Sequence, residues 1–172
     1  SPKMKPGAFR HQEQEMFRTV EAIHFTLLHD DGMGLDTINE SDLIILGVSR
    51  TGKTPTSIYL SCRKLKVANI PIIAEEAMED MLLGRLEGIR RRKLVGLIME
   101  ADVLTGVRTE RSQVLTGSHQ ARQSIRPYAD VDEIRREIRF CLSLFRDLGI
   151  PVVNVTWRAI EEISLEILNT VG

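Results

Sequence analysis

Short apolar runs alternate along the chain with longer stretches in which apolar and polar residues recur at helical spacing. The apolar runs are nearly continuous, as expected of strands covered on both faces, and they predict strands at residues 42–46, 67–73, 94–99 and 151–155. The helical spacing predicts helices at residues 12–29, about 55–66, 75–92, 101–114, 130–149 and 160–168. This alternation indicates an α/β domain, with a mostly parallel sheet of about four or five strands and helices on both faces.

Two of the predicted helices have a clear apolar face. In the first helix, it consists of Met16, Phe17, Val20, Ile23, Leu27 and Leu28. In the helix after residue 130, it consists of Ile134, Ile138, Cys141, Leu142, Phe145 and Leu148. Asp130 and Glu133 form a capping box at the start of this second helix, and Gly149 ends it. The basic run at residues 90–93 is expected to be the solvated end of a helix.

Composition narrows the class of protein. The 172 residues, 42% of them hydrophobic, suffice for one domain with its own core. The net charge of −1 and the interspersed charges do not favour nucleic acid as partner, and no apolar stretch approaches the length of a membrane span. Cys62 and Cys141 fall in helical patterns, which favours reduced, buried thiols in a cytoplasmic protein.

The most specific signal is a phosphate-binding loop directly after the first predicted strand. Its eight residues match the pattern G-x-x-x-x-G-K-[ST], and they are Gly47, Val48, Ser49, Arg50, Thr51, Gly52, Lys53 and Thr54. A strand that ends in a glycine turn and continues as a helix directs several backbone N–H groups at one point. There the helix dipole and the charge of Lys53 add positive potential. The sequence therefore predicts a P-loop-type three-layer domain that binds the phosphates of a nucleotide.

Thr54 has two interpretations. In a phosphate-binding loop this hydroxyl normally holds Mg²⁺. Here Pro55 follows it, and a residue before proline is disfavoured in helical backbone. Thr54 is then expected to be the N-cap, with Pro55 at the first helical position and the Thr54 hydroxyl bound to the Ser57 N–H. The sequence leaves both roles open.

The segment from Ser112 to Tyr128 is polar and carries His119, Arg122 and Arg126. One interpretation is a solvated surface loop. The other is a mobile lid whose arginines meet phosphate, because lids that close over phosphoryl transfer are often of this size and composition. Arg122 and Arg126 are also the most cationic candidates for contact with a protein partner.

The residues around the loop resemble the regulatory proteins of pyruvate, phosphate dikinase and of phosphoenolpyruvate synthase. The similar run extends over residues 42–73 and contains Gly-Val-Ser-Arg-Thr-Gly-Lys-Thr-Pro-Thr-Ser-Ile-Tyr-Leu and then Lys-Val-Ala-Asn-Ile-Pro. Further matches in the family's order are His29 to Gly32, the spacing of Leu104, Arg108 and Arg111, and Tyr128-Ala129 before the capped helix. The resemblance covers essentially the whole chain and corresponds to the C-terminal half of a full-length member.

The resemblance implies a bifunctional enzyme. As a kinase, it would use ADP to phosphorylate a threonine beside the catalytic histidine of the dikinase or synthase. As a phosphorylase, it would use inorganic phosphate to remove that group and release pyrophosphate. The chain begins with serine, and its first seven residues have the composition of a linker. We therefore expect residues 1–11 to be a linker from a missing N-terminal half, and residues 12–172 to be the P-loop kinase/phosphorylase domain.

Candidate catalytic residues follow from the loop and from the resemblance together. Lys53 would neutralise the transferring group, and the guanidinium of Arg50 could bind one of its oxygens with two hydrogen bonds. Asp30 and Asp31 match the family and would act as base or orient the acceptor hydroxyl, although adjacent acids after a helix are also a plain turn signal.

Two further candidates depart from the family's usual residues. Glu100, at the end of the third predicted strand, is the candidate acidic partner of a metal held by Thr54, where the family more often has aspartate. Arg158 stands where the family usually has lysine. It can replace that lysine if only charge is needed, but not if the lysine must lose a proton.

Two other classes of function are weighed against this enzyme. A small-metabolite P-loop kinase would need a concave acceptor pocket, whereas a protein kinase needs an open surface that admits a folded partner. A nucleotide-sensing module without catalysis is the third class. The residues decide neither between dikinase and synthase as target nor between ADP and ATP. They also leave the oligomeric state open, a homodimer included.

Overall fold

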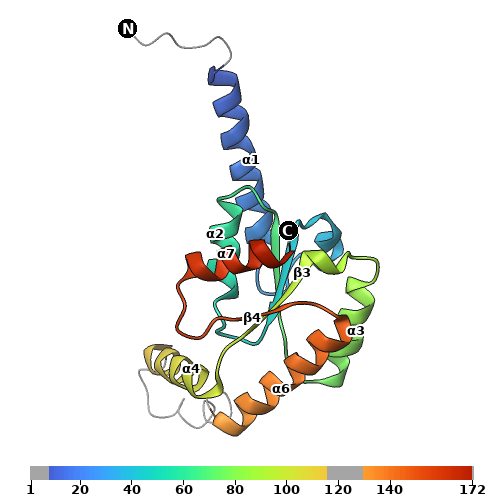
Figure 1. Cartoon of the computed structure of the whole chain (residues 1–172), viewed down its shortest axis with the longest axis vertical. Coiled ribbons are helices and arrows are strands. Elements are labelled where there is room, and N and C mark those ends of the chain that lie inside the picture. The colour runs from blue at the N-terminus through green and yellow to red at the C-terminus, as the bar shows by residue number, and fades with distance from the viewer. Residues whose placement is uncertain (1–7, 116–129, 172) are drawn as a thin grey trace.

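The computed structural model describes residues 8–115 and 130–171, arranged as Figure 1 shows. His119, Arg122 and Arg126 of the predicted loop or lid therefore lie outside the described residues. The strands are β1 (Leu43–Gly47), β2 (Val67–Pro71), β3 (Leu94–Ile98) and β4 (Val152–Asn154). The helices are α1 (Ala8–Leu28), α2 (Lys53–Ser61), α3 (Glu76–Leu86), α4 (Ala101–Leu115), α6 (Val131–Leu148) and α7 (Ile160–Val171), with two 3-10 helices, η1 (Leu35–Glu40) and η2 (Arg91–Lys93).

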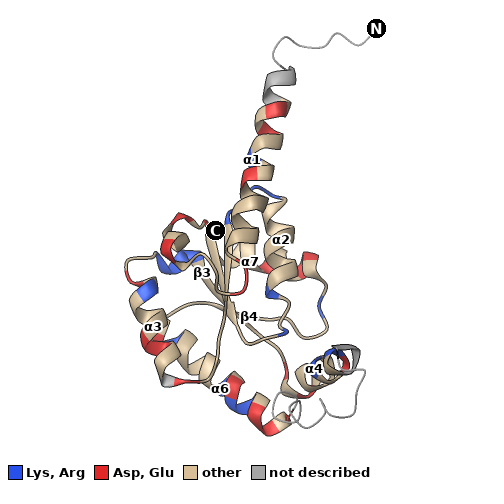
Figure 2. Cartoon of the chain, turned by 180° about the vertical axis from the view of Figure 1, so that it is seen from behind, with Lys and Arg blue, Asp and Glu red and all other residues tan. Residues whose placement is uncertain are grey.

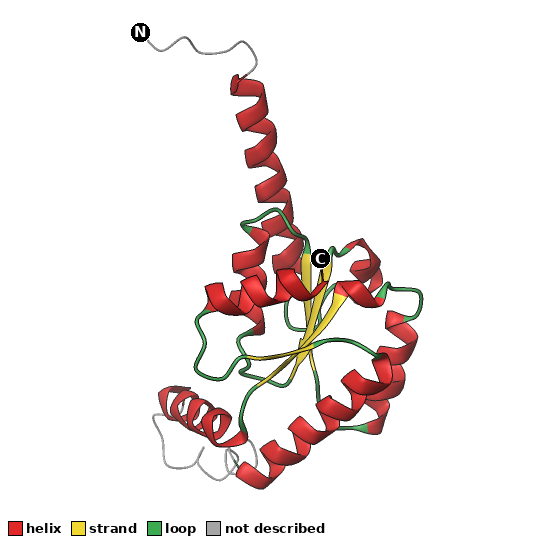
Figure 3. Ribbon diagram, viewed as in Figure 1, coloured by secondary structure: helices red, strands yellow, loops and turns green. Residues whose placement is uncertain are grey.

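The four described strands form one parallel sheet in the order β2-β1-β3-β4. Strand β1 is central, with Ile45 opposite Asn69 on β2 and opposite Val95 on β3. Parallel neighbours must be joined by crossovers, so helices separate every pair of consecutive strands. Figure 3 shows the sheet in the middle of the body with helices around it. The predicted fold class is confirmed.

Alternate residues of each strand face opposite layers of helices. One layer packs α3, α4 and α6 against the sheet, with Ile44 and Leu46 of β1 at its centre. The other packs α2 and α7 against the sheet, with Leu43 and Ile45 of β1 at its centre. All five residues of β1 are buried, which explains why its sequence is a continuous apolar run and not an alternating one.

A glycine in β3 lets α6 approach the sheet closely. A Cβ atom on Gly96 would lie 2.4 Å from ring carbons of Phe145, which is fully buried in α6. The aromatic ring therefore fills the space above Gly96, where any other residue would place a side chain. This contact fixes the position of α6 against the sheet.

Helix α1 extends away from the body, and its packed face differs from the predicted one (Figure 1). Its contacts with α2 and β2 bury Ala22, Phe25 and Thr26, and His29 is buried in the turn that follows. Most of the residues predicted for the apolar face are exposed, among them Phe17 at 75% and Met16 at 67%. The helical spacing predicted the helix correctly, but the neighbouring elements reach only its last turns, so spacing alone chose the wrong face.

The second predicted helix begins and ends earlier than expected. Helix α2 ends at Ser61, and a turn over residues 62–64 leads into β2. Cys62 lies in this turn and is exposed, so the prediction that it is buried is wrong. The buried residues of α2 are Lys53, Thr56, Ser57, Leu60 and Ser61, and Cys62 lies just beyond the last of them. Cys141 is buried as predicted, and burial raises the pKa of its thiol to about 12.

Helix α6 has the predicted ends but a slightly different buried face. The Asp130 carboxylate accepts hydrogen bonds from the N–H groups of Asp132 and Glu133, and Gly149 ends the helix in the left-handed conformation. Leu142 is exposed, contrary to expectation, while Leu144 is buried. The change of buried face follows from Phe145, whose ring over Gly96 sets the rotation of the helix.

Two smaller expectations at helix ends are also corrected. Residues 112–115 of the predicted loop are the last turn of α4. The basic run forms the separate helix η2 instead of the end of α3, because Gly88 adopts a positive φ of 80° and interrupts the chain before it. Arg91 and Arg92 are exposed, as predicted for this run.

The surface of the described residues carries both signs of charge. Figure 2 shows Lys and Arg interspersed with Asp and Glu on the helices that surround the sheet. Within the described ranges, none of the helices combines the length and the apolar composition that crossing a membrane requires.

The packing of Phe145 over Gly96 gives a test of the fold. Gly96→Ala places a methyl group where the ring lies, so we expect it to lower the free energy of unfolding by about 1–3 kcal/mol. Gly84→Ala, in α3, is the matched control. Its new methyl group would meet no atom within 4 Å, and a helical glycine destabilises by roughly 0.5–1 kcal/mol relative to alanine. Urea unfolding of both variants checks the prediction, and equal stability of Gly96→Ala and the parent protein would contradict it.

Candidate functional site

The phosphate-binding loop joins the carboxyl end of β1 to the start of α2. Helix α2 begins at Lys53, and Gly52 is its N-cap in the left-handed conformation. Thr54 is thus a helical residue, and the prediction that it is the N-cap is wrong. Pro55 is tolerated as the third helical residue because the first turn needs no intrahelical donor, and the residue four positions earlier lies outside the helix.

Two residues of the loop adopt left-handed backbone on either side of Thr51. The φ angle is 72° at Arg50 and 76° at Gly52. The hydroxyl of Thr51 donates to the carbonyl of Val48 at 2.9 Å and closes the turn from within. Left-handed residues in such a turn direct successive N–H groups to one side, which creates a concave binding site for an anion.

The side chain of Lys53 is folded back beneath the loop. Its residue exposure is only 6%, and Nζ donates a hydrogen bond to the carbonyl of Val48 at 2.9 Å. Burial lowers the pKa of Lys53 to about 8, while the nearby Asp31 carboxylate acts in the opposite direction. A bound phosphate would give this amino group a full counter-charge, so the site as built favours an anion.

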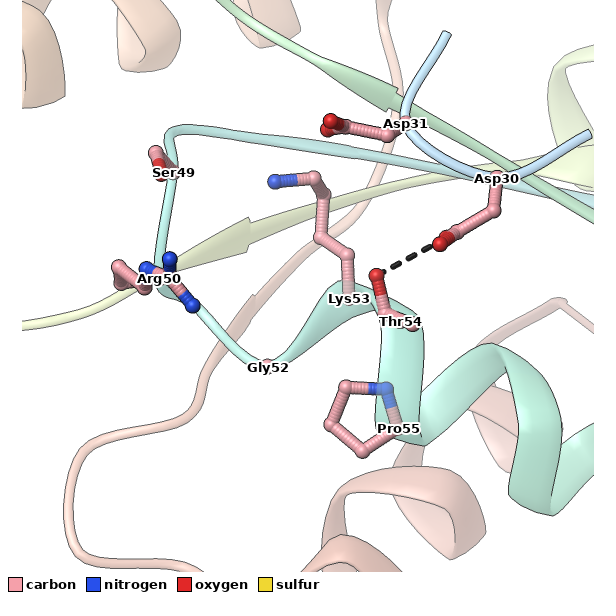
Figure 4. Close-up of a pocket in the computed structure, with 8 residues that line it drawn as sticks. All are labelled: Asp30, Asp31, Ser49, Arg50, Gly52, Lys53, Thr54 and Pro55. Carbon is pink, nitrogen blue, oxygen red and sulfur yellow. Dashed lines mark hydrogen bonds between the residues drawn. The ribbon is translucent and has the colours of Figure 1, made fainter. Parts of the chain in front are cut away.

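The loop forms the wall of a pocket of about 370 Å³ (Figure 4). In Figure 4 the amino group of Lys53 lies inside the turn of the loop, between Ser49 and Asp31. Seven predicted site residues and Pro55 line this pocket: Asp30, Asp31, Ser49, Arg50, Gly52, Lys53, Thr54 and Pro55. The other three loop residues, Gly47, Val48 and Thr51, are buried beneath it.

Asp30 is held by two donors. The hydroxyl of Thr54 donates to Oδ1 of Asp30 at 2.9 Å, and the side-chain amide of Asn69 donates to the same oxygen. The hydroxyl of Thr54 therefore meets a carboxylate and does not bind the Ser57 N–H. This link joins the turn after α1 to the first turn of α2.

Asn69 is a residue of the site that sequence reasoning missed. It lies on β2, is 1% exposed, and accepts a hydrogen bond from the N–H of Asp31 at 3.0 Å through Oδ1. Its backbone also pairs with the carbonyl of His29 and with the N–H of Gly32. One asparagine therefore orients both acidic residues. The available signal was a polar amide inside the apolar run 67–73, since a buried amide needs partners.

Arg108 is a second residue without a predicted role. It is 1% exposed on α4, and its guanidinium donates to both oxygens of the Glu137 carboxylate on α6, at 2.7 and 3.1 Å. It also donates to the carbonyl of Ser49 at 3.2 Å. The ion pair thereby ties two helices to the backbone of the loop. Its signal in the sequence was the position of Arg108 one turn after Leu104, on the buried face of the helix.

Two predicted residues are not brought into this pocket. Glu100 follows β3 and lines a different hollow with Arg135, Arg139 and Asn154. Arg158 forms an ion pair with Glu166 and donates to the carbonyl of Asn154 at 3.2 Å, so its guanidinium is turned toward α7. Glu100 follows β3 and Arg158 follows β4, whereas the phosphate-binding loop follows β1.

The donors at the pocket suit a metal that arrives together with phosphates. Among the described residues, no group of three His, Cys, Asp or Glu side chains could hold a metal ion alone. Thr54 and Asp30 supply two neighbouring oxygens at the mouth of the loop. Mg²⁺ usually combines one or two such protein oxygens with water and substrate phosphates, and these residues fit that pattern.

Comparison with known proteins places the chain in a family. The sequence profile described as "Kinase/pyrophosphorylase" matches residues 1–168. A relative from Novosphingobium aromaticivorans, named "Putative pyruvate, phosphate dikinase regulatory protein", is 40% identical over 97% of the chain and 56% of its own length. Relatives from Syntrophomonas wolfei and Enterococcus faecalis, with the same name followed by "2", are 36% identical over 97% and 100% of the chain, and over 58% and 59% of their own lengths.

The chain therefore belongs to the kinase/pyrophosphorylase family, as the resemblance in its sequence indicated. It spans less than three-fifths of the length of these relatives.

Replacing Lys53 by methionine tests the cost of the buried charge. Its pKa is about 8 in the folded protein and 10.5 ordinarily, so the unfolded chain binds more protons between these values. The destabilisation is complete below pH 8 and disappears as the pH rises to 10.5. Burying the charged amino group costs about 3 kcal/mol of stability. Removing the side chain also removes its hydrogen bond to Val48, which reduces the gain in stability by about 1 kcal/mol. We expect Lys53→Met to raise the free energy of unfolding by about 2 kcal/mol at neutral pH. Urea unfolding across the pH range measures this gain, and a gain that does not shrink above pH 8 would contradict it.

The role of Asn69 is tested by Asn69→Ala. The substitution removes the acceptor for the N–H of Asp31 and one of the two donors to the Asp30 carboxylate, so we expect a loss of about 1–3 kcal/mol in the free energy of unfolding. Asn39→Ala, at an exposed position of η1, is the matched control and should change stability by less than about 0.5 kcal/mol. Similar denaturation midpoints for the two variants would show that Asn69 does not hold the acidic turn.

Proposed function

We propose that this chain carries the catalytic site of a bifunctional kinase and phosphorylase that regulates pyruvate, phosphate dikinase or phosphoenolpyruvate synthase. The observation that carries the proposal is the buried Lys53 amino group, held beneath a loop with left-handed backbone at Arg50 and Gly52 and lining one pocket with Asp31. Membership of the kinase/pyrophosphorylase family and the names of the relatives support the reaction class and the target.

One pocket serves both directions in this proposal. A nest of N–H groups with one lysine recognises a tetrahedral anion and not a whole nucleotide. The same groups would hold the β-phosphate of ADP in the kinase direction and inorganic phosphate in the phosphorylase direction. In the first, the β-phosphoryl group passes to a threonine hydroxyl and AMP leaves. In the second, phosphate takes the group from phosphothreonine, and pyrophosphate and threonine are released.

The cations and carboxylates of the pocket divide the chemical roles. Lys53 and Arg50 neutralise the charge on the transferring group, which is the main requirement of phosphoryl transfer. Asp31 is the candidate base, because its exposed carboxylate lines the pocket. Asp30 already accepts from Thr54 and Asn69, so it orients the first turn of α2 instead of taking a proton. Arg158 would act only on the protein target, from outside the pocket.

Mg²⁺ is the proposed metal. Thr54 and Asp30 would hold it, and bound there it would neutralise negative charge on the phosphates. In this assignment Asp30 takes the role that the sequence suggested for Glu100. The protein target is a threonine on a large folded enzyme of central metabolism, so the proposed place of action is the cytoplasm.

Activity with the proposed target is the decisive test. We expect the protein to transfer label from the β-phosphate of ADP to a threonine of the dikinase or synthase, and added phosphate then to release labelled pyrophosphate. Lys53→Ala should lower both rates at least about a hundredfold, since it removes the charge that faces the transferring group. Lys64→Ala, just beyond the opposite end of the same helix, should keep both activities. The label is followed on the protein by autoradiography and in solution by chromatography.

The outcomes separate the classes of function. Transfer to a small metabolite but to neither protein would replace this proposal by the metabolite-kinase alternative. Nucleotide binding without any phosphoryl transfer would support the alternative that the chain is a nucleotide-sensing module. Phosphorylase activity that survives in Lys53→Ala would disprove the shared pocket.

A further inference from the structure

A strongly exposed aromatic side chain lies in the turn between β4 and α7. Trp157 is 85% exposed, and it is the one tryptophan in the 172-residue chain. Its φ angle of 55° is left-handed, a conformation that is a genuine outlier for a bulky residue. Folding alone favours neither a solvent-exposed indole nor a positive φ for tryptophan. Both features therefore point to a function.

The turn around Trp157 is rigidly braced. The hydroxyl of Thr156 donates to Oδ1 of Asn154 at 2.6 Å and accepts from the N–H of Glu100 at 2.9 Å. On the other side, the N–H of Arg158 donates to the carbonyl of Val155 at 3.2 Å, and its guanidinium is held by Asn154 and Glu166. Both chain neighbours of Trp157 are therefore held in place, and with them the backbone that carries the indole.

The topology of the sheet determines where the turn between β4 and α7 lies. All strands are parallel, so the turn after β4 and the loop after β1 lie at the same edge. The two strands are separated only by β3, which puts their ends about 10 Å apart. Helices α2 and α7 follow the loop and the turn, respectively, and pack side by side on one face of the sheet, as Figure 1 shows. The turn that carries Trp157 thus lies at the same edge of the sheet as the phosphate pocket, two strand spacings along it.

We propose that Trp157 is the stacking platform for the base of the nucleotide whose phosphates bind at Lys53. This inference rests on the proposed function and assigns the purine end of its nucleotide substrate. An indole offers the largest flat apolar face of any side chain, and stacking needs one accessible ring face at a fixed position. A protein-docking surface would instead need a contiguous apolar patch, whereas the chain neighbours of Trp157 are Thr156 and Arg158.

The single tryptophan makes the proposal directly measurable. We expect ADP to change the fluorescence of Trp157, and pyrophosphate, which fills only the phosphate pocket, to leave it unchanged. Trp157→Ala should weaken ADP binding roughly tenfold or more, because stacking on one aromatic ring contributes on that order. Its affinity for pyrophosphate should stay the same, and Trp157→Phe should restore part of the affinity for ADP. Isothermal titration measures both ligands, and Phe17→Ala, at another exposed aromatic on α1, is the matched control.

Each alternative outcome is distinct. If ADP binds with no change in fluorescence and with equal affinity for Trp157→Ala, the stacking role is wrong while the nucleotide site stands. If Trp157→Ala raises only the KM for the protein target, the indole contacts that protein and the proposal is overturned. If neither ADP nor pyrophosphate binds the parent protein, the proposed function fails, and this inference fails with it.

Discussion

The central position of β1 is the constraint on which the rest of the structure depends. The strand is hydrogen-bonded on both sides to parallel neighbours and is buried along its whole length. A parallel strand in this position needs a helical layer on each face, and the chain must leave it at one edge of the sheet. Both the three-layer architecture and the place of the phosphate-binding loop follow from this.

The loop is then held from two directions. From within, Thr51 and Lys53 both donate to the carbonyl of Val48. From the layer of α4 and α6, the ion pair between Arg108 and Glu137 reaches the carbonyl of Ser49. These bonds keep carbonyl oxygens turned inward, so that N–H groups remain for the pocket. A preorganised site of this kind needs little rearrangement when charge develops in it.

Much of this site was predictable from residue types and spacing, and the remainder depended on contacts between distant segments. The strand and loop pattern fixed the residues from Gly47 to Thr54, because backbone geometry there is local. Asn69 and Arg108 act across 38 and 59 residues of chain, on Asp31 and Ser49, and spacing within one element carries no such information. The errors have a similar origin. Leu142 sits on a helix whose rotation was chosen by tertiary packing, and Cys62 lies just beyond a helix that ends earlier than its spacing predicts.

The left-handed backbone at the site has a consequence for selection. Asp31, Arg50 and Trp157 all have positive φ values, which glycine adopts with less strain than a residue with a side chain. Selection for thermal stability alone would thus drive these positions toward glycine or asparagine, and the chain would gain robustness while losing its carboxylate, its guanidinium and its indole. Relatives that keep bulky or charged residues at these positions would show selection for activity over stability. Positions with positive φ therefore indicate which columns of a family alignment carry function.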